Sequence, residues 1–232
     1  MYRVKKVSRS EAPELYNVVD RLSRKTGIKT PTLMVSNIPI PNAFAYSSPL
    51  TGTRVAVTSE LLSALELEEV EAVIGHELGH LRHRDVQVMM FVSILPALFY
   101  YIGYSMLWSS MFSRRDQRGN GGLAALIGVG SILVYWVLTM FSLYLSRLRE
   151  YYADRHSVSV VEDGARRLSE GLAKIVYSTE KGRRYRPQAQ SSSSLKALFI
   201  SDPDNAGRDL EEMYRTNVIT DRALVERYLG RR

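Results

Sequence analysis

The stretch AVIGHELGHLRHRD, residues 72–85, decides the fold and raises the question of function, because it places three of the chain's four histidines on one helix-forming segment. On a helix, His76 and His80 share a face, and two imidazoles at this spacing bind one Zn²⁺ at about 2.0–2.1 Å each. Glu77 lies about 100° further round the helix, beside such a metal, where a general base acts on water. The alternative is a solvated helix face with incidental histidines, and this stretch alone leaves it open.

Two glycines flank the histidine face. Gly75 and Gly79 each cost a helix interior about 1 kcal/mol relative to alanine. They lie four residues apart, so they share a strip of the helix surface that has no side chains. The pattern therefore predicts that another backbone approaches the helix closely at this strip.

A catalytic zinc needs a third protein ligand and an open position for water. In metzincins that ligand is a histidine six residues beyond the second one, but here the position is Val86. His83 lies only three residues past His80, which is awkward for ligation from the same short helix. We therefore interpret His83 as a polar helix residue or an outer-shell group rather than a ligand.

Two long runs without charge follow the motif, from Val86 to Phe112 and from Gly119 to Ser146. Each exceeds the roughly 20 residues that an α-helix needs to cross a bilayer. They predict a transmembrane hairpin over 86–146 with a short loop near 113–121. Residues 1–85 and 147–232 are then the N-terminal and C-terminal parts of one soluble domain.

The hairpin indicates where the third ligand lies. His80 precedes the first run by six residues and Glu150 follows the second by four, and a hairpin returns the chain to the same membrane face. We therefore predict that Glu150 is the third ligand. Asp154 shares its face at i+4 and is placed to bond a zinc-bound histidine. The alternative is that both carboxylates serve only in surface ion pairs with the neighbouring arginines Arg147, Arg149 and Arg155.

Elsewhere the chain predicts short helices and a small sheet, so the fold class is mainly α with a small β-sheet (α+β). An amphipathic helix is expected over 11–25, with Ser10 as its N-cap and Gly27 at its end. Strands are expected over 32–36, 42–46 and 53–58. Further helices are expected from Ser59, from Leu67 without a break into the first span, over 163–178 and around 210–214. The polar segment 180–194 is expected to be a mobile loop.

Composition narrows the function classes. The net charge is +7 and the pI is about 9.6, but the basic residues after the second span are interleaved with acidic ones and form no nucleic-acid-binding motif. Anionic lipid headgroups are the simpler partner for a chain with two spans. Cysteine is absent, so a metal must use nitrogen and oxygen ligands. The N-terminal stretch lacks the apolar region of a signal peptide, so we expect the first span to direct insertion.

HELGHLRHRD, two spans and then SRLREYYAD together resemble the HtpX-like integral-membrane zinc metalloproteases, which are gluzincins related to the CAAX prenyl proteases. PNAFAY (41–46) and, more weakly, LFISDPDNAGRDL near the end extend the resemblance. It implies a zincin-like protease domain interrupted by the hairpin, and a zinc endopeptidase that degrades misfolded or membrane proteins in quality control. It also implies a prokaryotic plasma membrane with the active site on the cytoplasmic side.

Carried onto this sequence, the resemblance implies that His76, His80 and Glu150 bind zinc and that Glu77 is the catalytic base. It implies a substrate-binding strand edge at Asn42, Ala43, Phe44 and Ala45, although a plain core strand explains the same stretch. Typical members have a further pair of spans before the protease domain, and they have His-Pro where this chain has Asp202-Pro203. The stabiliser of the transition state is therefore open, with Arg208, Tyr151 and Tyr152 as candidates.

Three other functions remain alternatives at this point. The same chemistry serves a CAAX-type prenyl-protein protease. The fold also serves a non-catalytic, membrane-anchored zinc-binding protein, although such a protein has no chemical need for Glu77. A purely structural hairpin protein would bind no zinc.

Overall fold

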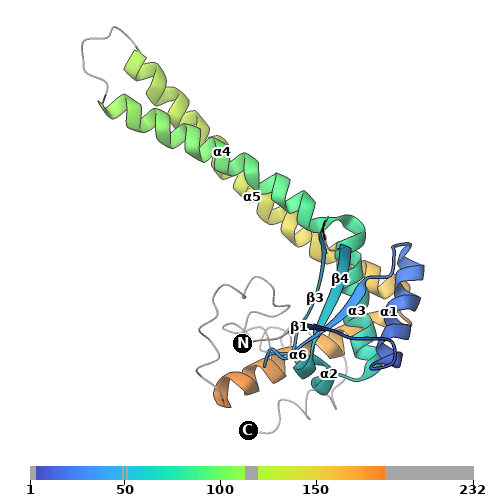
Figure 1. The fold of residues 1–232 in the computed structure, drawn as a ribbon. Helices are drawn as coiled ribbons and strands as arrows, with labels where there is room; N and C mark the ends of the chain where they lie inside the picture. Colours follow the sequence, from blue (N-terminus) through green and yellow to red (C-terminus); the bar gives the residue numbers. More distant parts are fainter. Residues whose placement is uncertain (1–3, 49, 51, 113–119, 186–232) are drawn as a thin grey trace. The chain divides into compact units, whose positions relative to one another are not determined.

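The computed structural model describes residues 4–48, 50, 52–112 and 120–185. The chain divides into two compact units, one formed by Met1–His83 with Tyr152–Arg232 and the other by Arg84–Tyr151. The elements are, in chain order, β1 (Val4–Lys6), α1 (Pro13–Thr26), β2 (Thr32–Ser36), β3 (Ala43–Ser48), β4 (Gly52–Thr58), α2 (Ser59–Ala64), α3 (Leu67–His83), α4 (Asp85–Phe112), α5 (Asn120–Val160) and α6 (Gly164–Tyr185) (Figure 1).

Helix α1 forms where the amphipathic pattern predicts it, but its start differs from the expectation. Ser10 is not the N-cap, because its hydroxyl lies 2.9 Å from that of Ser8 and the helix begins at Pro13 with Ala12 as cap. Proline suits the first helical position because it has no amide hydrogen to leave unbonded there. Gly27 ends the helix at φ +75°, a left-handed conformation that glycine adopts without strain.

The sheet has four strands in the order β1-β2-β4-β3. β2 and β4 are parallel, while β1 and β3 pair antiparallel with β2 and β4 respectively. The three strands expected from the sequence are present, and β1 is additional. Among the described residues, β3 therefore lies at one edge of the sheet, with a hydrogen-bonded partner strand on one side only.

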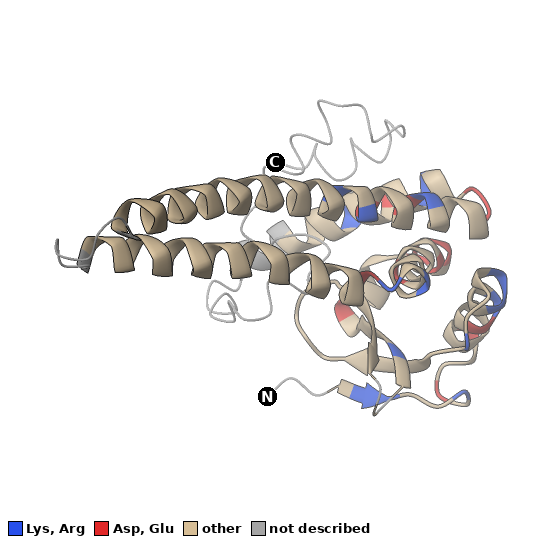
Figure 2. Cartoon of the chain, turned by 90° about the horizontal axis from the view of Figure 1, so that it is seen from above, with Lys and Arg blue, Asp and Glu red and all other residues tan. Residues whose placement is uncertain are grey.

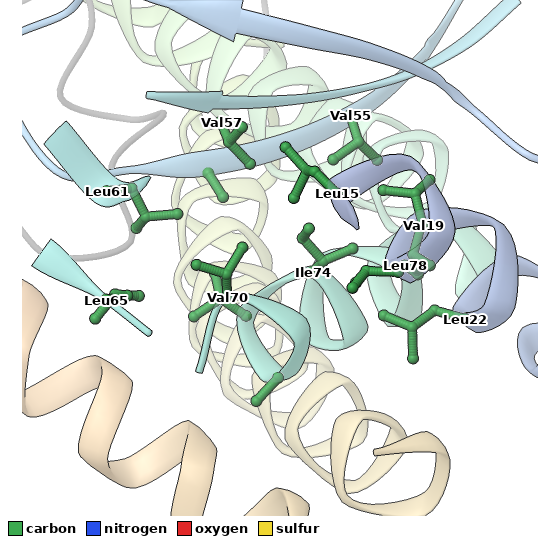
Figure 3. Close-up of a cluster of buried hydrophobic side chains, with 14 of the residues drawn as sticks. Leu15, Val19, Leu22, Val55, Val57, Leu61, Leu65, Val70, Ile74 and Leu78 are labelled. Atoms are coloured by element: carbon green, nitrogen blue, oxygen red, sulfur yellow. The ribbon is translucent and has the colours of Figure 1, made fainter. Parts of the chain in front are cut away.

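The hydrophobic core of the first unit lies between the sheet and helices α1 and α3 (Figure 3). The predicted apolar face of α1 is buried there, as are alternate residues of β4. Figure 3 labels ten of the core residues: Leu15, Val19, Leu22, Val55, Val57, Leu61, Leu65, Val70, Ile74 and Leu78. This core fixes α3 against β3, and α3 carries the histidine motif.

Helix α3 does not continue into the first apolar helix, contrary to the sequence-based expectation. It ends at His83, Arg84 adopts φ +53°, and α4 starts at Asp85. A left-handed non-glycine residue is uncommon and interrupts the hydrogen-bond ladder of a helix. His80 therefore lies on a different helix from the one that begins the hairpin.

The glycine strip of α3 lies against the last part of α5, as its composition predicts. A Cβ at Gly79 would lie 3.1 Å from both Ala153 Cα and His156 Cβ, and a Cβ at Gly75 would lie 3.2 Å from Ser157 Oγ. Ser157 also donates a hydrogen bond to the Ala72 carbonyl at 2.7 Å. The two glycines thus allow residues 153–157 to pack directly on the motif helix.

This contact makes a stability prediction with an internal control. Gly79→Val should lower the free energy of unfolding by about 1–3 kcal/mol, because the added side chain has no space. Gly171 on α6 is the control, since a Cβ there would meet nothing nearer than 3.6 Å. Gly171→Ala should therefore stabilise by about 1 kcal/mol through helix propensity. Unfolding midpoints of the purified chain would test both, and a Gly79→Val protein as stable as wild type would contradict the prediction.

In the second unit, α4 and α5 are long and apolar enough to cross a membrane by length and composition. No charged side chain occurs on α4 after Asp85 or on α5 before Arg147, which Figure 2 shows as uniformly tan helix. A Cβ at Gly128 of α5 would lie 2.8 Å from Leu107 Cγ of α4, so the two helices approach closely there. At the charged end, Arg149 Nε lies 3.1 Å from the buried Asp85 carboxylate.

Helix α6 is longer than expected from the sequence. The helix predicted over 163–178 extends to Tyr185, so the first six residues of the expected loop, 180–185, are helical. Inside the first unit, Lys174 of α6 pairs with Glu69 of α3, and both residues are buried. The rest of the expected loop and the helix around 210–214 lie outside the described residues.

Candidate metal centre and active site

The histidines of the motif converge on one point. The Nε2 atoms of His76 and His80 lie 3.0 Å apart, and their rings meet edge to face with centroids 4.7 Å apart. Two nitrogens that bind one zinc tetrahedrally at about 2.05 Å are themselves about 3.3 Å apart. The observed distance therefore fits a shared metal ion. It arises because His76 and His80 lie about one helical turn apart on the same face of α3.

Asp154 of α5 approaches the other side of the first histidine. Its Oδ1 lies 2.9 Å from His76 Nδ1, which is within the distance of an ion pair. A carboxylate at Nδ1 favours the tautomer whose Nε2 carries the lone pair for a metal. Since the Asp154 side chain is about half exposed, solvent weakens this contact.

Glu150 lies one turn before Asp154 on the continuous helix α5. Residues four apart on a helix share a face, so Glu150 is on the face that carries Asp154. His76, His80 and Glu150 form a group that could hold a metal ion, one nitrogen or carboxylate oxygen from each. Of the arginines in the alternative reading of these carboxylates as surface ion pairs, Arg149 contacts Asp85.

Glu77 lies on the buried side of the motif helix and contacts the sheet. The residue is 7% exposed, and its Oε2 accepts a hydrogen bond of 3.1 Å from the backbone amide of Ala45 on β3. The pair is separated by 32 residues in the chain. Nothing in the sequence pattern indicates this bond, because it depends on how β3 packs against α3.

The four residues expected to bind substrate lie at the start of β3. Asn42 and Ala43 are buried, each 1% exposed, while Phe44 and Ala45 are partly exposed. Asn42 and Ala43 are therefore inaccessible to a substrate, and only Phe44 and Ala45 of this set are partly exposed. The stacked rings of Phe44 and Tyr46, 6.0 Å apart, lie on the other face of the strand from the core.

The remaining two histidines differ in their surroundings. His83 is exposed and its ring lies 6.0 Å from that of Tyr152. His156 is buried, and its Nε2 lies 3.0 Å from Thr26 Oγ1 of α1. Burial, reinforced by the positive charge of Arg82 and by His83, lowers the pKa of His156 to about 4, so this ring is neutral near pH 7. Sequence reasoning gave His156 no role, and the structure shows that it ties α5 to α1.

The candidates for stabilising a transition state are not brought together by the described structure. Tyr151 and Tyr152 are exposed on α5, at 59% and 44%. Arg208 and the Asp202-Pro203 pair lie outside the described residues.

A family model and the sequence relatives of the chain both point to the same family of proteases. The model of peptidase family M48 matches residues 9–213. A protease HtpX homolog of Thermoplasma acidophilum is 38% identical over 216 residues, which cover 90% of this chain and 66% of that protein. The protease HtpX homolog 2 of Sulfurisphaera tokodaii is 42% identical over 168 residues, which cover 72% of this chain and 52% of that protein. The chain thus spans between half and two thirds of the length of these relatives.

Among solved structures, the crystal structure of S. mikatae Ste24p superposes with a TM-score of 0.50 at 15% identity. The match covers 90% of this chain and 52% of that one. At this identity the likeness is one of fold alone.

Proposed function

The chain belongs to peptidase family M48, and we propose that it is a membrane-embedded, zinc-dependent endopeptidase. The observation that carries the proposal is the convergence of His76 Nε2 and His80 Nε2 at 3.0 Å, with the carboxylate of Glu77 held on the adjacent flank of the same helix. A general base one residue from a metal-binding histidine suits hydrolysis better than structural zinc binding, which needs no such base.

In this proposal His76, His80 and Glu150 hold the zinc ion. Two nitrogens and one carboxylate oxygen form the donor set of a catalytic site that keeps one position open. The family is metal-dependent by its peptidase class, and a chain without cysteine offers only nitrogen and oxygen donors. Asp154 keeps the His76 ring in the metal-binding tautomer.

In this proposal, different residues of the chain have different roles in peptide hydrolysis. A zinc ion held by His76, His80 and Glu150 would supply Lewis acidity, which would polarise the scissile carbonyl and make water more acidic. Glu77 removes the proton from the attacking water and delivers it to the leaving amine, so its carboxylate must face both positions in turn. The exposed edge of β3 holds the substrate backbone as an added strand, which binds polypeptides with little dependence on sequence. Tyr151 or Arg208 stabilises the charge that develops on the carbonyl oxygen.

We further propose that the substrates are misfolded or membrane-inserted polypeptides. The two apolar helices would place the enzyme in a prokaryotic plasma membrane, with the site on the cytoplasmic side. Backbone-based binding suits quality control, because damaged proteins share exposed backbone rather than a sequence motif. The substrate class is supported by these features of the chain and by its family.

Metal removal tests the proposal directly. The purified chain in detergent should cleave an unfolded test polypeptide, lose that activity on treatment with a chelator and regain it when Zn²⁺ is added back. Cleavage would be followed by mass spectrometry, which also identifies internal cleavage sites as expected for an endopeptidase. Activity that survives complete removal of metal would refute the zinc mechanism, and an inert but zinc-loaded protein would favour a binding role.

A further inference from the structure

The backbone of β3 presents a defined set of groups at the open edge of the sheet. Thr58 N donates to the Asn42 carbonyl at 2.9 Å, so the backbone groups of Asn42 point toward β4. In an antiparallel pair, successive residues alternate between bonding the partner and pointing away from it. The amides and carbonyls of Ala43, Ala45 and Ser47 therefore point away from β4, toward the edge that has no strand in the described sheet.

One of these outward amides is already engaged. Ala45 N donates to Glu77 Oε2 at 3.1 Å. The acceptor is a buried carboxylate, and a hydrogen bond to a charged group is stronger than one between neutral groups. The bond restricts the rotation of the carboxylate about its last torsion, which is otherwise broad and loosely defined.

We infer that the backbone amide of Ala45 is a positioning group that holds the carboxylate of Glu77 in its working orientation, and that a bound substrate strand bonds to the exposed outward amide of Ser47 but not to this one. The inference rests on the proposed function, because it concerns the base of that reaction. It assigns Ala45 a role that does not depend on its methyl group, so that among substitutions only proline, which has no amide hydrogen, removes the donor itself.

The geometry has a consequence for the substrate. An added strand normally exchanges two hydrogen bonds with each outward-facing residue of the edge. At Ala45 only the carbonyl is available, because Glu77 occupies the amide. Substrate recognition and orientation of the base are thus joined at one residue of β3.

Hydrogen exchange tests the resting contact without any activity measurement. In the full, zinc-loaded chain in detergent, the Ala45 amide should be protected although it faces the open edge, whereas the Ser47 amide on the same edge should exchange quickly. Glu77→Ala should speed exchange at Ala45 by about 10- to 100-fold, the factor expected for a hydrogen bond to a charged acceptor. Glu77→Gln, which retains a carbonyl oxygen, should keep most of the protection. Rapid exchange at Ala45 in the wild-type chain would refute the inference.

Kinetics of two proline variants test the catalytic consequence. Proline is tolerated on an edge strand where the amide faces outward, so Ala45→Pro removes the donor without breaking the ladder to β4. We expect kcat to fall about tenfold or more with KM changed by less than about twofold. Ser47→Pro, which removes an amide available to substrate, should instead raise KM and leave kcat near the wild-type value.

The opposite pattern would overturn the inference: a raised KM with unchanged kcat in Ala45→Pro would mean that the substrate itself uses this amide. Circular dichroism and exchange within β4 confirm that each variant is folded. If the wild-type chain cleaves nothing, the proposed function fails, while the exchange experiment still decides whether Ala45 holds Glu77.

Discussion

Glu77→Gln should lower the rate of peptide hydrolysis by about 10²–10⁴-fold while the protein keeps its metal. The range is that of a positioned general base, and glutamine cannot accept the proton of the attacking water. The substitution leaves both imidazoles of the metal group unchanged, and glutamine retains an oxygen that can accept the hydrogen bond from Ala45 N. Loss of activity should therefore come without loss of structure, and zinc content and kcat would be measured on the same preparation.

A neighbouring glutamate on the same helix provides the control. Glu68 lies in the first turn of α3 and is exposed. Glu68→Gln makes the same chemical change away from the site, so it should retain wild-type kcat and zinc content. If Glu77→Gln retained activity as well, the assignment of the base would be wrong, and if it lost zinc, its role would be structural.

Glu150→Ala should weaken zinc binding by more than about 100-fold. Removal of a direct ligand costs more than removal of an outer residue that only orients one, for which about 10- to 100-fold is typical. Asp154→Asn should fall within that smaller range, because Asp154 contacts His76 Nδ1 and not the metal-binding nitrogen. The two residues lie one turn apart on α5, so the comparison separates ligation from orientation within a single helix.

Zinc affinity would be measured by competition with a chelator of known affinity, on the full chain in detergent. Glu162, an exposed acid just beyond the end of α5, is the control for loss of one negative charge. Glu162→Ala should bind zinc as the wild-type chain does. Equal affinities of the Glu150→Ala protein and this control would show that the third ligand lies elsewhere.

Most of the helices and strands follow from local patterns in the sequence. The apolar spacing of α1 is sufficient, because this helix buries one face and exposes the other. β4 is predicted from its β-branched run, and its last four residues are buried on both faces. β1 has no such pattern: its three residues Val4–Lys6 are all exposed, and pairing with β2 alone makes them a strand. The break at Arg84 also has no signal, since neither glycine nor proline marks it.

Some contacts of the candidate site also follow from local sequence patterns, and others do not. The four-residue spacing of His76 and His80 predicts their convergence, because a helix alone sets it. The contact between Asp154 and His76 was expected from the order of motif, hairpin and second motif, and the structure places the two groups 2.9 Å apart. The Ala45 bond to Glu77 was not predictable, because it requires the register of β3 and its packing on α3, both of which are set by the core.

The open edge of β3 carries a risk as well as a binding surface. A strand edge that accepts any backbone also accepts the edge of another copy of the same protein, which is how sheets aggregate. β3 is six residues long, and the amide at its third residue is occupied by a carboxylate. An inward-pointing charged residue at a strand edge is one of the features that discourage edge-to-edge pairing of two copies. Glu77, the base of the proposed reaction, would thus also reduce self-association of the protein through the edge of β3.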